Sequence, residues 1–208
     1  MLEKNVDDDK KLKGLERYSA RDIENWKENE KIIVAKSDSD VEDFIKNSLN
    51  GNIKFGEMRL GRIDNGLAQR ILNETGVNLS GYSLLVRADD VRHVFNKHGS
   101  SKDENSRGQQ AITARDIEIF PEVIADFDLV RKGENNTLLF TKEVSGKLTA
   151  VSIYANGRRS LSLKTMYKRI DRSATQAANA KRSRQTSKND LGGTSDNKIQ
   201  TSNKKSQE

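Results

Sequence analysis

Four short β-rich runs, separated by turns that contain glycine, occupy the later part of the chain. They span residues 128–132, 137–143, 148–155 and 160–165, with Gly133, Gly146 and Gly157 in the turns between them. Runs of this length and spacing are typical of hairpins in an antiparallel β-meander. Such a sheet has one face to bury, so the rest of the domain has to supply helices that cover it.

The earlier part of the chain alternates strand-like runs with amphipathic helical segments. We expect strands at residues 31–36, 53–60 and 82–86, and helices at residues 41–49, 65–75 and 89–98. Thr113 is the expected cap of a short helix that runs to Pro121, and residues 100–110 are expected to form a polar loop. This order predicts an α+β fold in which N-terminal helices pack on a C-terminal antiparallel β-meander.

The composition limits the chain to one modest core. Hydrophobic residues make up 33% and aromatic residues 5% of the 208 residues. We therefore place a single folded domain at residues 31–170, preceded by a polar lead-in (residues 1–30) with a short helix that contains Trp26. Residues 171–208 hold no aromatic side chain and are dominated by Ser, Thr, Asn, Gln and Lys, so they are predicted to be a disordered basic tail.

The net charge of +6 is weaker evidence for a nucleic-acid partner than it first suggests. Residues 171–208 hold eight Lys and Arg against four Asp and Glu, a net +4, which leaves only +2 on the other 170 residues. The chain has no cysteine, which excludes disulfides, thiol nucleophiles and thiolate metal sites. No apolar stretch approaches the ~18 residues of a membrane span, and the N-terminus resembles no signal peptide.

The two histidines of the chain, His93 and His98, fall within six residues of each other. On the expected helix, His98 continues the apolar stripe of Val91 and Val94, whereas His93 points about 140° away from His98. The two are therefore not expected to share one compact site. The alternative to a catalytic role is that one fills the core while the other lies at the surface. A spacing of five residues does not suit two ligands on one helix, so no metal site is expected.

Residues 156–169 form a basic segment without an acidic residue. In an extended strand, Ser160, Ser162 and Lys164 would share one face, and Leu161, Leu163 and Thr165 the other. With Arg158 and Arg159 before it and Tyr167 after it, this strand is a candidate surface for phosphate binding and base stacking. The alternative is an ordinary solvated edge strand protected by lysine.

Several of these segments together resemble one nuclease family. The resemblance rests on residues 91–99, Gln109, residues 112–113, Asp116, residues 121–124 and residues 161–167, and it spans about residues 31–168. The family is the phage-Barnase-EndoU-Colicin-RelE-like nuclease group, found in phage head-associated proteins and in polymorphic toxins of mobile elements. It implies N-terminal helices before a four-stranded antiparallel sheet, and RNA cleavage without a metal or other cofactor.

The resemblance also implies roles for individual side chains. His93 or His98 would be the general base or acid, with Lys164 and Thr165 beside it as further catalytic residues. The expected contacts to phosphate and RNA come from Arg92, Arg158, Arg159, Ser162 and Tyr167, and Gln109 and Thr113 are expected to support the site. The implied substrate is RNA, with tRNA as one candidate, and the implied partners are an immunity protein or a virion head protein. A cytoplasmic or virion-delivered toxin is expected, without a membrane partner.

Two other function classes fit parts of the sequence. A non-catalytic RNA-binding or virion-interaction module would bind RNA through Arg158, Arg159 and Lys164 and would not need the histidines. An ADP-ribosyltransferase is less well supported, because the chain lacks a clear Arg…Ser-Thr-Ser…Glu-x-Glu series.

Overall fold

The computed structural model describes residues 14–19, 32–144 and 146–170. These residues belong to the first of two compact units into which the chain divides, residues 1–170 and 171–208. The short helix expected around Trp26 and the expected disorder of residues 171–208 lie outside the described residues. Within the described residues, no helix is both long enough and apolar enough to cross a membrane.

Six helices and nine strands make up the described part of the first unit. The helices are α2 (Asp38–Leu49), α3 (Asn65–Thr75), α4 (Ala88–His98), α5 (Ser101–Ser106), α6 (Ala114–Glu118) and α7 (Phe120–Ala125). The strands are β1 (Leu15–Glu16), β2 (Ile32–Val34), β3 (Glu57–Ile63), β4 (Ser83–Arg87), β5 (Gln109–Gln110), β6 (Leu129–Lys132), β7 (Thr137–Glu143), β8 (Lys147–Ala155) and β9 (Ser160–Arg169).

All nine strands join in one sheet. Its main path is β1-β3-β4-β9-β8-β7-β6, and β2 pairs with β3 while β5 pairs with the end of β9. The strands β6 to β9 form the predicted antiparallel meander. A parallel pairing of β4 with β9 connects this meander to the N-terminal strands. The α+β class is thus confirmed, and the sheet is larger and more mixed than a four-stranded meander.

The helices begin and end where local chemistry predicts. Ser37 caps α2 in a capping box with Asp40, and the Asp64 side chain accepts a hydrogen bond from the Leu67 amide at the start of α3. Gly76 ends α3 with a φ of 73°, a left-handed conformation that favours glycine. Helix α3 has the predicted bounds, whereas α2 begins three residues before its expected start at residue 41, because its cap is Ser37.

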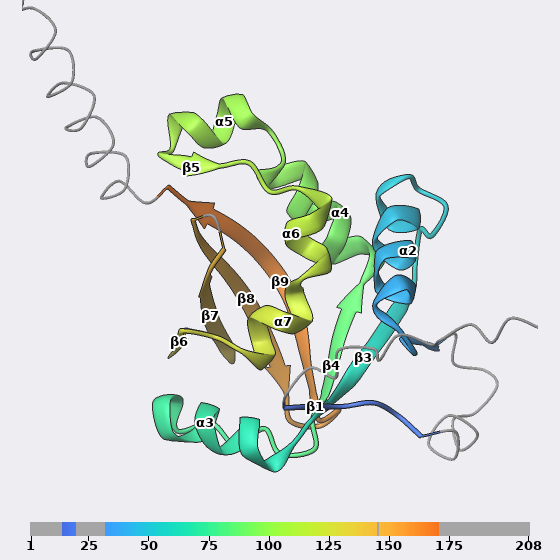
Figure 1. Ribbon diagram of the computed structural model, residues 1–208, viewed down its shortest axis with the longest axis vertical. Coiled ribbons are helices and arrows are strands. Elements are labelled where there is room, and N and C mark those ends of the chain that lie inside the picture. Colours follow the sequence, from blue (N-terminus) through green and yellow to red (C-terminus); the bar gives the residue numbers. More distant parts are fainter. Residues whose placement is uncertain (1–13, 20–31, 145, 171–208) are drawn as a thin grey trace, which may run out of the picture. The chain divides into compact units, whose positions relative to one another are not determined.

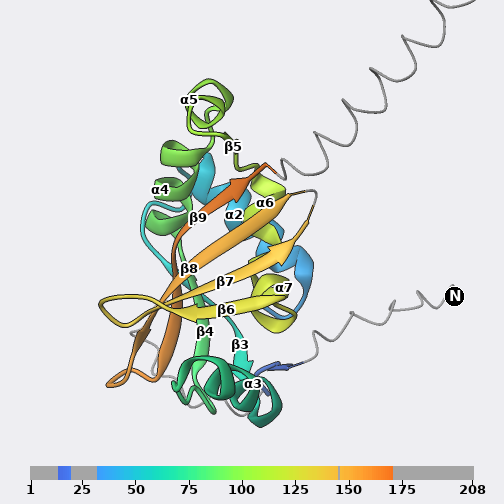
Figure 2. The ribbon, with the colours of Figure 1, turned by 90° about the vertical axis from the view of Figure 1, so that its left-hand side faces the viewer.

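The core lies on one face of the meander. Phe140, Ala150 and Met166 lie next to one another across β7, β8 and β9, and all three are fully buried. Helix α7 packs against β7 and β8, α4 runs along β9, and α2 packs against α4 and α6 (Figure 1). Seen from the side in Figure 2, β6 to β9 lie side by side in front of α2. Leu139 and Val151, on the opposite face of the meander, are only partly buried.

The expectation of a polar loop at residues 100–110 is wrong. These residues include helix α5 and strand β5. Ser100 begins α5 by accepting a hydrogen bond from the Asp103 amide, and the only residue that α5 buries is Glu104. A helix that buries a carboxylate rather than an apolar stripe leaves no hydrophobic periodicity, so the pattern did not predict it. Strand β9 extends beyond the predicted end at Thr165, because its last residues pair with β8, and Lys168 and Arg169 pair with β5 as well.

A β-bulge at Lys164 changes which side chains of β9 share a face. Val151 pairs with Thr165, but the next residue, Ser152, pairs with Leu163, so Lys164 is an extra residue without a partner on β8. Beyond the bulge, Met166 and Lys168 face the core, and Thr165 and Tyr167 lie on the half-exposed face. The prediction that Thr165 shares a face with Leu161 and Leu163 is therefore wrong.

Candidate active site at the end of strand β9

The two histidines lie on different faces of helix α4. His98 lies in its last turn, in line with the fully buried Val91 and Val94, and its side chain is 12% exposed. His93 is exposed on another face of the helix. Lys97 shares this last turn with His98 but is exposed. Only His98 therefore lies in a partly enclosed setting.

The ring of His98 lies between a carboxylate and an aromatic ring. Its Nδ1 is 3.3 Å from Oε2 of Glu104 on α5, and its ring centroid is 6.5 Å from that of Tyr167 on β9. The backbone amide of Ile112 donates a 2.7 Å hydrogen bond to the carbonyl of His98, which ties the end of α4 to the segment before α6. The histidine thus lies where α4, α5 and β9 meet.

Glu104 is a buried neighbour of His98 that the sequence pattern did not indicate. Its side chain is fully buried, and its Oε1 accepts a 2.8 Å hydrogen bond from Nη1 of Arg107. A buried carboxylate is costly unless a charged or hydrogen-bonding partner compensates it. Arg107 supplies one such partner and His98 faces the other carboxylate oxygen. The only signal in the sequence was a run of polar residues beside the histidine.

Three side chains of the outer sheet face extend this arrangement. Gln109 lies opposite Arg169 in the β5–β9 pair, and Arg169 lies on the same face of β9 as Tyr167. The guanidinium carbon of Arg169 is 5.5 Å from the centre of the Tyr167 ring. Among the described residues, the buried Oε1 of Gln109 has no hydrogen-bond partner. We refer to the residues His98, Glu104, Arg107, Gln109, Tyr167 and Arg169 as the His98 cluster.

The strand continues this polar face away from the His98 cluster. Thr165 lies two residues before Tyr167, which is about 7 Å in an extended strand. Its Oγ1 is buried and has no hydrogen-bond partner in the described part of the chain. Lys164 is exposed in the bulge, and Ser162 is half-buried. Lys164, Thr165 and Tyr167 thus lie within four consecutive residues of β9, and the ring of Tyr167 lies beside that of His98 on α4.

Arg92, predicted as a phosphate contact, is bound to the protein's own backbone. Its guanidinium donates to the carbonyl oxygens of Ile53 at 2.7 Å, Ser48 at 3.4 Å and Lys54. These three carbonyls lie at the end of α2 and in the loop that follows it. These bonds commit the guanidinium to holding this loop against α4, which argues against the phosphate contact predicted for Arg92.

Arg158 and Arg159 lie in the turn before β9, at the end opposite the His98 cluster. Arg159 donates a 2.7 Å hydrogen bond from Nη2 to the carbonyl of Ser80, and its Cζ lies 5.8 Å from the centre of the Tyr82 ring. Tyr167 follows Arg159 by eight positions, which is about 26 Å along an extended strand. The basic segment of the sequence is therefore not one continuous patch around a single phosphate.

Thr113 hydrogen-bonds to Asp116, which forms a buried ion pair with Lys168. Its side chain caps α6 and donates to Oδ2 of Asp116 at 2.8 Å, and Nζ of Lys168 lies 2.8 Å from Oδ1 of the same carboxylate. Burial on its own would raise the pKa of Asp116, but the hydrogen bonds from Lys168 and Thr113 outweigh it and lower this pKa. The interaction joins α6 to β9 on the side facing away from Tyr167.

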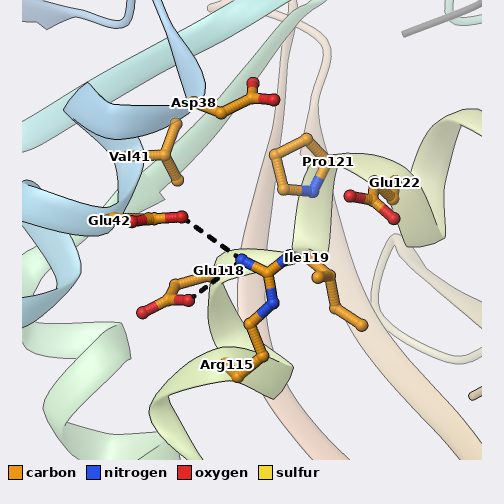
Figure 3. Close-up of a pocket in the computed structure, with 8 residues that line it drawn as sticks. All are labelled: Asp38, Val41, Glu42, Arg115, Glu118, Ile119, Pro121 and Glu122. Carbon is orange, nitrogen blue, oxygen red and sulfur yellow. Dashed lines mark hydrogen bonds and ion pairs between the residues drawn. The ribbon is translucent and has the colours of Figure 1, made fainter. Parts of the chain in front are cut away.

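A separate acidic hollow lies between α2 and the α6–α7 segment (Figure 3). Within it, Nη1 of Arg115 lies 3.3 Å from carboxylate oxygens of both Glu42 and Glu118. None of the predicted site residues lines this hollow of about 80 Å³. Across residues 14–19, 32–144 and 146–170, no three His, Asp or Glu side chains are arranged to hold a metal ion.

One end of β9 thus carries a partly enclosed histidine, an aromatic ring and cations, which are side-chain types that can exchange protons with a phosphodiester and bind it. Residues 61–176, which are 116 of the 208 residues, match the family model described as phage-Barnase-EndoU-ColicinE5/D-RelE like nuclease 3. The chain belongs to this family of nucleases, which bears out the resemblance seen in the sequence. No curated protein and no solved structure matches the chain.

Proposed function

We propose that this nuclease domain is an endoribonuclease that needs no metal ion and cleaves RNA through the ribose 2′-hydroxyl. The observation that carries the proposal is the position of His98. Its ring is partly enclosed, faces Tyr167 at 6.5 Å between ring centroids, and lies beside the half-exposed face of β9. Histidine is the side chain best suited to exchange a proton with substrate near neutral pH.

In the proposed reaction, Nε2 of His98 accepts the proton of the 2′-hydroxyl. The 2′-oxygen then forms a bond to phosphorus, and the bond from phosphorus to the 5′-oxygen of the next nucleotide breaks. The Tyr167 hydroxyl donates a proton to that leaving oxygen. The products are a 2′,3′-cyclic phosphate and a free 5′-hydroxyl, and each proton transfer contributes roughly 10²–10⁴-fold to the rate.

The neighbouring cations fit the charge that develops on phosphorus. Lys164 is exposed in the bulge of β9, and Arg169 lies over the Tyr167 ring. Positive groups placed at a transition state with extra negative charge stabilise it more than the ground state. Thr165 and Ser162 supply hydroxyl groups on the same strand for contacts to the sugar-phosphate backbone.

We further infer that the enzyme acts as a toxin or effector of a phage or another mobile element. The family description, which names phage-associated and colicin-like nucleases, supports this setting. RNA, with tRNA as one candidate, is the proposed substrate. An immunity protein or a virion head protein is the proposed protein partner, and a cytoplasmic or virion-delivered location follows from this role.

The direct test uses purified protein, RNA and EDTA. We expect cleavage of unstructured RNA in EDTA, with 2′,3′-cyclic phosphate ends, and no cleavage of the same oligonucleotide when every ribose is 2′-deoxy. Cleavage of the deoxy substrate, or a strict need for added metal, would contradict the 2′-hydroxyl mechanism. Salt-sensitive RNA binding without any cleavage would favour the non-catalytic module instead.

A further inference from the structure

The fully buried Glu104 is paired with the only partly enclosed histidine among the described residues. Its Oε2 lies 3.3 Å from Nδ1 of His98, yet the two atoms are not aligned as a hydrogen bond. In the described part of the chain neither atom has any other hydrogen-bond partner. Two complementary buried polar groups that face only each other need an explanation, because an unsatisfied buried group is costly.

The fold holds the carboxylate in this place from two sides. Ser100, which directly follows Gly99, caps α5 and thereby fixes where the helix that carries Glu104 begins. Arg107, one turn later, holds Oε1 at 2.8 Å and leaves Oε2 directed at the imidazole. Hydrogen bonds at active sites are often long before substrate binds and become shorter in the substrate complex.

We propose that Glu104 is a positioning residue for His98. Its Oε2 accepts a hydrogen bond from the N–H group at Nδ1, which selects the neutral tautomer with a free lone pair on Nε2. A histidine held in this tautomer is ready to accept a proton at Nε2, and the carboxylate then stabilises the imidazolium that forms. This inference rests on the proposed ribonuclease function for its catalytic part. The tautomer itself is independent of that function.

The same arrangement distinguishes the two histidines. His93 is exposed, and no hydrogen bond or ion pair joins its side chain to any described residue. It therefore lacks a group that would fix its tautomer or ring orientation. The positioning role of Glu104 implies that α5, a helix missing from the sequence-based expectation, completes the site around His98.

The experiment compares Glu104→Gln, Glu104→Asp and Asp103→Asn in the full chain. Asp103→Asn is the matched control, because it removes one negative charge from an exposed position on the same helix. The tautomer of His98 is read from the ¹⁵N chemical shifts of its ring at neutral pH. Thermal unfolding confirms that each variant is folded, and single-turnover cleavage of an RNA oligonucleotide gives the rate.

We expect wild type and Asp103→Asn to keep the proton on Nδ1, and Glu104→Gln to lose this preference. The cleavage rate of Glu104→Gln should fall about 10²-fold or more with little change in KM, and Glu104→Asp should recover part of the rate. An unchanged tautomer in Glu104→Gln overturns the proposal, as does a changed tautomer with an unchanged rate. A wild-type protein that holds the Nδ1 proton but cleaves no RNA contradicts the proposed function, and with it the catalytic part of the inference.

Discussion

Nζ of Lys168 on β9 lies 2.8 Å from Oδ1 of Asp116 on α6, and less than a tenth of either side chain is exposed. Asp116 also accepts hydrogen bonds from the amide and the hydroxyl of Thr113. Because Lys168 follows Tyr167 directly, the ion pair fixes the part of β9 that presents the Tyr167 ring to His98. Stability and site geometry are therefore linked through adjacent residues of one strand.

Asp116→Ala is expected to destabilise the domain by about 3–5 kcal/mol, because it leaves the Lys168 ammonium buried without its partner. Chemical unfolding at pH 7 measures this loss. The double variant Asp116→Ala with Lys168→Met removes both charges, and it should be more stable than Asp116→Ala alone. Equal stability of the single and double variants would show that the buried charge is not what costs the energy.

The same ion pair should make the stability of the folded domain depend on pH. The folded state holds the pKa of Asp116 below its ordinary value of 3.8. The stabilisation is therefore complete above that ordinary value and is lost as the pH falls through the lower, folded-state pKa. In unfolding experiments, the difference between wild type and Asp116→Asn should shrink below about pH 4. A difference that stays constant down to pH 2 would contradict this linkage.

For Asp90 we expect the opposite dependence of the folding stability on pH. Burial, together with repulsion from Asp89 and against the attraction of Arg87, raises the pKa of Asp90 from 3.8 to about 6. The folded protein thus binds the proton more tightly, and the stability falls as the pH rises from about 4 to about 6. Asp90→Asn should stabilise the protein by about 1–2 kcal/mol at pH 7.5, a figure reduced for the exposed quarter of the side chain, and by close to nothing at pH 3.5. Asp89→Asn removes the repulsion but leaves the buried carboxyl group of Asp90, so it should give only a fraction of this pH-dependent gain.

Arg92→Met is expected to lower stability by about 2–4 kcal/mol, because it removes the charged donor to the carbonyls of Ser48, Ile53 and Lys54. Cleavage per folded molecule should stay within about threefold of wild type, less than the loss expected for a general acid or base. Lys97→Met removes a positive charge from an exposed position on the same helix and controls for charge. A stable Arg92→Met protein with strongly reduced cleavage would restore Arg92 as a phosphate contact.

Lys164 and Arg159 should behave differently although both belong to the basic segment. Lys164→Ala is expected to reduce RNA cleavage by about 10-fold or more, since it removes a cation near the reacting phosphate. Arg159→Ala should leave the rate nearly unchanged, because its guanidinium is bound to Ser80 at the far end of β9. Equal losses in both variants would indicate that the whole segment follows the RNA backbone.

Helices α2, α3 and α4 and the meander were predictable because their signals are local. The caps of α2 and α3 and the stripe of Val91, Val94 and His98 are visible in the sequence itself. The separation of His93 from His98 follows from helical spacing alone. These features depend on neighbours within a few residues, so no knowledge of the folded structure was needed.

The composition of the site was less predictable because it depends on contacts between distant segments. The bulge at Lys164 is a property of the β8–β9 register, and no residue type in β9 indicates it. Glu104 is buried only because α4 ends beside β9 and α5 turns back over His98. Arg92 and Arg159 looked like free cations because their carbonyl partners lie 38 or more residues away in the chain.

The central claim, that His98 and not His93 carries the chemistry, is tested most directly by single-turnover RNA cleavage in EDTA with His98→Ala and His93→Ala. The two variants remove the same side chain from the same helix, so they control for each other. We expect His98→Ala to lose about 10²–10⁴-fold in rate while His93→Ala stays close to wild type. Loss of activity in His93→Ala with full activity in His98→Ala would contradict the account.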